Sequence, residues 1–81
     1  MAITSSQMRG ARGLLGLSQT QLAEAAEVSV ETIKRLEGLG AELTANRATM
    51  AAIMRAFEGA GVIFIDENGE GPGVRLRKTN T

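Results

Sequence analysis

Apolar and polar positions follow a helical period over most of the N-terminal three quarters of the chain. The clearest part is the segment 18–37, in which two amphipathic runs each follow a serine, Ser18 or Ser29. Ser18 and Gln21 form the Ser-x-x-Gln capping box that satisfies free amide groups at a helix start. Glu31 adds a negative charge in the first turn of the second run, where the helix dipole favours it. The predicted helices span about 19–26 and 30–36.

The apolar residues of these two helices lie on single faces, which are both buried only if the helices cross. Val28 lies between the helices as an apolar plug, and Ala23 is small where the helix axes must approach closely. The apolar positions on the two faces are Leu22, Ala23, Ala26, Ile33 and Leu36. This layout is typical of a helix-turn-helix, although an ordinary αα-hairpin has the same caps and periodicity.

Two further helices are predicted on either side of this motif. The first spans residues 5–16 and is capped by Ser5 or Ser6. The second spans residues 47–60 and is capped by Thr44 or Asn46, after a connection rich in glycine that contains Gly38 and Gly40. The apolar positions are Met8, Ala11, Leu14 and Leu15 in the first helix, and Met50, Ile53, Met54 and Phe57 in the second.

The pattern changes after residue 61 from a helical period to short β-forming runs. Residues 62–65 are continuously apolar, residues 74–77 alternate apolar with basic side chains, and only turn-forming residues separate them. Because an isolated hairpin is marginal in water, this tail must cover its own helices or pair with strands of a second chain. We favour pairing between chains. The expected dimer contacts are Val62, Ile63, Phe64, Ile65, Val74 and Leu76.

The predicted fold is therefore mainly α, with a helical domain over residues 1–61 and a β-hairpin or strand pair over residues 62–81, whose last few residues are expected to be flexible. The 81 residues form one small domain, which buries roughly 60% of its unfolded surface, so oligomerisation would stabilise it. No apolar run is long enough to span a membrane, and the N-terminus lacks the apolar core of a signal peptide. We expect a cytoplasmic protein without membrane contact.

The chain contains no cysteine and no histidine, which excludes disulfides, thiolate chemistry and nearly all zinc sites. The acidic loop that begins at Asp66 lacks the ligand spacing of an EF-hand. No nucleophile and base can be paired convincingly. We therefore expect no enzyme activity, no metal, no cofactor and no small-molecule ligand.

The motif combines the lead-in Gly16-Leu17-Ser18 with Gln19, Thr32 and Glu37 and with the apolar ladder described above. With these residues it resembles the helix-turn-helix of the phage-repressor or XRE type, also called the Cro/C1 type. Glu27 departs from this pattern, because the family usually has glycine at this turn position, where φ is often positive. A non-glycine residue there costs about 1 kcal/mol. The ending GVIFIDENGEGPGVRLRK is similar to the tails of short XRE-type regulators of bacteria. The matching positions are Gln19, Leu22, Ala23, Val28, Ser29, Thr32, Ile33, Leu36 and Glu37, after the lead-in Gly16-Leu17-Ser18.

The resemblance implies a four-helix, lambda-repressor-like domain whose second motif helix enters the major groove of double-stranded DNA. It also implies an internal ion pair between Arg12 and Glu37 that fixes the first helix to the recognition helix. The expected base contacts are Val30, Glu31, Lys34 and Arg35. The expected phosphate contacts are Ser18, Gln19, Thr32, Arg9 and Arg47.

The charge of the chain bears on how it would bind DNA. Nine basic residues balance nine acidic ones, which argues against a nonspecific coat for DNA. Each chain neutralises few phosphates, so two copies are needed for firm binding. We expect a homodimeric transcriptional repressor, or an activator, at an inverted repeat. The alternative is a DNA-binding antitoxin or interaction module whose tail binds a partner protein.

Overall fold

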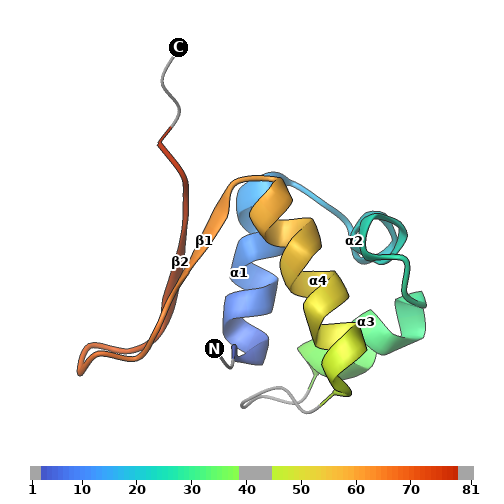
Figure 1. Ribbon diagram of the computed structural model, residues 1–81, viewed down its shortest axis with the longest axis horizontal. Helices are drawn as coiled ribbons and strands as arrows, with labels where there is room; N and C mark the ends of the chain where they lie inside the picture. The colour runs from blue at the N-terminus through green and yellow to red at the C-terminus, as the bar shows by residue number, and fades with distance from the viewer. Residues whose placement is uncertain (1–2, 39–44, 79–81) are drawn as a thin grey trace.

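The computed structural model describes residues 3–38 and 45–78. Four helices precede a two-stranded antiparallel sheet (Figure 1). The elements are α1 (Ser5–Leu15), α2 (Gln19–Ala26), α3 (Val30–Glu37), α4 (Arg47–Gly59), β1 (Val62–Ile65) and β2 (Gly73–Leu76). The predicted mainly helical fold is confirmed. Gly40, the candidate cap Thr44 and residues 79–81, which were expected to be flexible, lie outside the described residues.

The start of α1 differs from the prediction. Its cap is Thr4, whose hydroxyl accepts from the Gln7 backbone N–H at 3.1 Å while the Gln7 side chain accepts from Thr4 N–H at 2.9 Å. Ser5 is instead buried inside the helix, where its hydroxyl donates to the carbonyl of Leu36 at 2.7 Å. Ser6 is exposed within the first turn. A Thr-x-x-Gln capping box was therefore present in the sequence one residue before the predicted caps.

The other helix starts are those predicted. Ser18 and Gln21 form the capping box of α2, Ser29 caps α3, and Asn46 caps α4. Glu27 ends α2 in the left-handed region with φ of 59°, as the family pattern at this turn position leads one to expect. The helix-turn-helix thus keeps its geometry without the usual glycine.

One cluster of apolar side chains forms the core between the helices and the sheet. Leu14 is an exception to the predicted pattern, because 43% of it is exposed. It lies one turn beyond Gly10 on the side of α1 that faces β2, where a Cβ on Gly10 would meet the Val74 side chain at 3.2 Å. The buried core residues are Ile3, Met8, Ala11, Leu22, Ala23, Ala26, Ile33, Leu36, Ile53, Phe57 and Val62.

The two strands pair with each other within the chain, and the hairpin packs on α1 and α4. Val62 lies opposite Leu76 in the register and Phe64 opposite Val74. The Phe57 and Phe64 rings meet edge to face, with centroids 5.6 Å apart. Val62 is only 1% exposed, so it belongs to the core of its own chain and not to a surface that a second chain can contact. The expected β-hairpin is therefore present, and the burial of Val62 removes this one residue from the expected dimer contacts; pairing between chains stays a prediction.

A single buried amide fastens the hairpin to the helices. The Gln7 side chain donates to the carbonyls of Ile65 and Gly73 at 3.1 and 3.0 Å. These two residues face each other at the end of the strand pair, next to the loop. Gln7 therefore joins the start of α1 to both strands. Among residues 3–38 and 45–78, no helix has the length and apolar character needed to cross a membrane.

Candidate nucleic-acid interface

The two sides of α3 carry different chemistry. Its inner side buries Ile33, Leu36 and Glu37, whereas Glu31, Lys34 and Arg35 are exposed on the outer side and Val30 is half-buried at its border. Helical spacing explains this division, because Lys34 and Arg35 follow Glu31 by three and four residues, the spacings that share one face of a helix. Arg12 and Glu37 form an ion pair. Within residues 3–38 and 45–78, Glu31, Lys34 and Arg35 take part in no ion pair. These three side chains are available to a ligand.

The starts of α2 and α3 present capped amides beside this surface. Ser18 is exposed, and its hydroxyl accepts from the Gln21 backbone N–H at 3.0 Å. Ser29 accepts from the Thr32 backbone N–H at 3.1 Å, and the Ser29 and Thr32 hydroxyls are 2.8 Å apart. Amides in the first turn of a helix lack intrahelical partners and favour anions such as phosphate.

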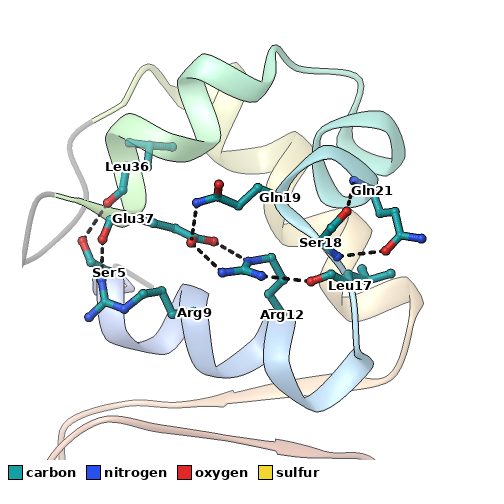
Figure 2. A network of polar contacts seen from close by, with 9 residues as sticks. All are labelled: Ser5, Arg9, Arg12, Leu17, Ser18, Gln19, Gln21, Leu36 and Glu37. Atoms are coloured by element: carbon teal, nitrogen blue, oxygen red, sulfur yellow. Dashed lines mark hydrogen bonds and ion pairs between the residues drawn. The ribbon is translucent and has the colours of Figure 1, made fainter.

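A buried carboxylate holds α1, α2 and α3 together (Figure 2). Arg12 binds Glu37 through two bonds, from Nε to Oε2 at 2.8 Å and from Nη2 to Oε1 at 2.9 Å. Gln19 Nε2 donates to Glu37 Oε1 at 3.1 Å, and Arg12 Nη1 donates to the Leu17 carbonyl at 3.0 Å. Glu37 is 5% exposed. We call these four residues the α3 brace.

Side chains of α1 also satisfy the carbonyls at the C-terminal end of α3, which have no intrahelical partner. Arg9 Nη1 donates to the Glu37 carbonyl, and Ser5 donates to the Leu36 carbonyl (Figure 2). Arg9 also donates to the Ser6 hydroxyl at 3.1 Å. Ser5, Arg9 and Arg12 of α1 thus all hold the C-terminal end of α3.

The family model described as helix-turn-helix matches residues 8–57, which is more than half of the chain. The chain belongs to the Cro/C1-type helix-turn-helix family, also called the XRE family. The resemblance drawn from the motif is confirmed, and this XRE-family protein is a DNA-binding helix-turn-helix regulator. No curated protein matches it.

The α3 brace of the XRE-family protein remains charged. Burial raises the pKa of Glu37, but the hydrogen bonds from Arg12 and Gln19 and the charges of Arg12 and Arg9 outweigh burial, so the pKa lies below its ordinary value. The hydrogen bond to Glu37 raises the pKa of Arg12. The pair is therefore an ionised, bidentate contact with little exposure on the carboxylate side.

The structure places the remaining sequence-predicted residues as follows. Gln19 is half-buried and its side-chain amide donates to Glu37, so the group left for a phosphate is its backbone N–H in the first turn of α2. Arg9 lies on the end of α3, and Arg47 is exposed at the first residue of α4. Sequence reasoning missed the contacts of Ser5 and Arg9 with α3, because they are made to backbone carbonyls, which no residue pattern marks.

Proposed function

We propose that this XRE-family protein is a homodimeric transcriptional repressor that binds an inverted-repeat operator through the outer side of α3. The observation that carries the proposal is the division of α3 into a braced inner side and an exposed outer side. Helix-turn-helix dimers place the second motif helix of each copy in the major groove, with half-site centres about 34 Å apart. The protein would repress by occupying a promoter.

Each exposed side chain of α3 suits a particular group in the major groove. Arg35 can donate two parallel bonds to guanine, and Lys34 can donate to a guanine or a phosphate. Val30 can contact a thymine methyl group, and Glu31 can accept from a cytosine amine. The backbone N–H of Gln19 and the exposed hydroxyl of Ser18 suit a phosphate, which would set the register of the recognition helix, whereas the Ser18 N–H is already bound by the Gln21 side chain.

Footprinting of the DNA upstream of the gene at two salt concentrations tests this proposal. We expect protection of a symmetric site, with protection that weakens as salt rises. If the protein shows nonspecific, salt-sensitive binding and protects no symmetric site, the proposal of an operator is overturned.

Arg35→Ala tests the base-reading role directly. We expect affinity for the protected site to fall by about 1–3 kcal/mol, with little change for unrelated DNA, because a bidentate guanine contact is lost. Arg55→Ala is the matched control, since it removes one exposed positive charge from α4 instead. Equal losses in the two variants would show that Arg35 acts only through its charge. Fluorescence anisotropy with both DNAs measures the difference.

A further inference from the structure

The charges of the hairpin are separated along its length. The hairpin tip carries Asp66, Glu67 and Glu70, and the hairpin foot carries Arg75, Arg77 and Lys78. All six residues are exposed, and none forms an ion pair within the described part of the chain. The turn projects away from the four helices (Figure 1), so the tip has no helix of its own chain beside it. Each hairpin therefore presents one acidic and one basic end.

The tip has a fixed conformation. The Glu67 carboxylate accepts from the backbone N–H groups of Gly69 and Gly71 at 2.8 and 2.7 Å. Both glycines have positive φ, which suits the tight turn. The hydrogen bonds from Gly71 and Gly69 lower the pKa of Glu67, so the acidic end keeps this charge at mildly acidic pH. The tip is thus an ordered acidic surface.

The exposed large apolar side chains of the described residues, Leu14 and Leu76, lie toward the foot. Gly10 of α1 lies against Val74 of β2. Leu14 is one turn beyond Gly10 on the same side of α1, and Leu76 is two residues beyond Val74 on the same face of the strand. They are 43% and 45% exposed and extend the contact between α1 and β2 outward. This end of the hairpin offers apolar area next to the basic foot.

We propose that a second copy of the chain docks along β2 about a two-fold axis, with its hairpin antiparallel to the first. Each acidic tip then faces the basic foot of the other copy and lies over Leu14 and Leu76 beside that foot. A parallel arrangement would bring like charges together, which is unfavourable. Because of the two-fold axis, each favourable contact is formed two times in the dimer. This inference rests on the homodimer of the proposed function and specifies its surface.

Charge reversal tests the arrangement in the full chain. The tip variant is Asp66→Lys with Glu70→Lys, and the foot variant is Arg75→Glu with Arg77→Glu. Glu67 is kept because it holds the loop. In each variant both ends of the hairpin have the same sign, so we expect the dimer dissociation constant to rise at least about ten-fold in sedimentation equilibrium.

The sharpest result comes from mixing the two variants. The tip variant has two basic ends and the foot variant two acidic ends, so an equimolar mixture should form a heterodimer. A chain that carries all four reversals should dimerise with itself again. Circular dichroism melting shows whether each variant is folded. If one variant is less stable, recovery of the dimer by the mixture or by the chain with four reversals still tests the charge pairing. Failure of both to recover the dimer, or a monomeric wild type, would overturn the arrangement.

DNA binding distinguishes failure of this inference from failure of the proposed function. On a duplex with one half-site, the tip and foot variants should bind as the wild-type monomer does, because the outer side of α3 is unchanged. If the operator is protected but neither the mixture nor the chain with four reversals recovers the dimer, only the antiparallel hairpin contact is overturned. If the dimer is recovered in these two samples but no operator is protected, only the proposed function is overturned.

Discussion

Two carboxylates on one helix have opposite environments in this protein. Glu37 is 5% exposed and is bound by the side chains of Arg12 and Gln19, whereas Glu31 lies on the exposed outer side of the same eight-residue helix. The two lie on different sides of α3, Glu31 in its first turn and Glu37 at its last residue. On the inner side, the carboxylate of Glu37 is held in an ion pair within the fold. On the outer side, the carboxylate of Glu31 is exposed and can contact DNA.

This division separates stability from DNA recognition on a single short helix. The α3 brace fixes the helix against α1 and α2, so side chains on the outer side need no intramolecular partner to hold their helix in place. Substitutions on the outer side should therefore change which DNA is bound, and substitutions in the brace should change whether the helix is held.

The largest effect is expected from Glu37→Ala. It leaves Arg12 without its partner and Gln19 without its acceptor, so we expect a loss of about 3 kcal/mol in the free energy of unfolding. Glu31→Ala should change stability by less than about 0.5 kcal/mol, because surface substitutions rarely do more. Urea denaturation of both variants measures the contrast, and equal losses would contradict it.

A double-mutant cycle identifies how much of this loss belongs to the ion pair. Arg12→Ala and Glu37→Ala together should cost less than the sum of the single losses, because both break the same contact. Strict additivity would show that the loss comes from other contacts of Glu37.

Gln7→Ala tests whether a neutral buried anchor matters as a charged one does. The variant leaves the carbonyls of Ile65 and Gly73 without their side-chain donor and removes half of the α1 capping box, so we expect a loss of about 2 kcal/mol. Gln21→Ala is the matched control, since Gln21 fills the same position in the α2 capping box but is exposed. If the two variants unfold at the same urea concentration, the hairpin anchor contributes nothing.

The sequence predicted the helices, the motif and the hairpin because each depends on local spacing. The family resemblance pointed to Glu31, Lys34 and Arg35 on the groove-facing side of α3, and all three are exposed in the structure. It did not predict that Leu14 is exposed, because periodicity marks a face of α1 but not whether helices or the edge of a hairpin cover it. It also did not give the hairpin contacts of Gln7, which join residues far apart in the chain through backbone carbonyls.

Acid should weaken the brace less than Glu37→Ala does, because protonation leaves the side chain in place. The pKa of Glu37 is lower in the folded chain than in the unfolded chain, where it takes its ordinary value of 4.5. The brace therefore stabilises the fold fully above pH 4.5 and loses this contribution as pH falls through the lower, folded pKa. Glu37→Gln should show a flatter decline of stability in acid than the wild type. Parallel declines would show that other carboxylates cause the acid sensitivity.

The smallest effect is expected at the turn that leads into α3. Glu27 has a φ of 59°, so Glu27→Gly should relieve about 1 kcal/mol of backbone strain, part of which is offset by the greater freedom of glycine in the unfolded chain. Glu27→Ala separates conformation from charge, because alanine keeps the strain and removes the carboxylate. A higher melting temperature for the glycine variant alone, with unchanged operator affinity, would show that the turn sets stability without touching the outer side of α3. A rise shared by both variants would attribute the effect to the charge among the exposed acids of the motif.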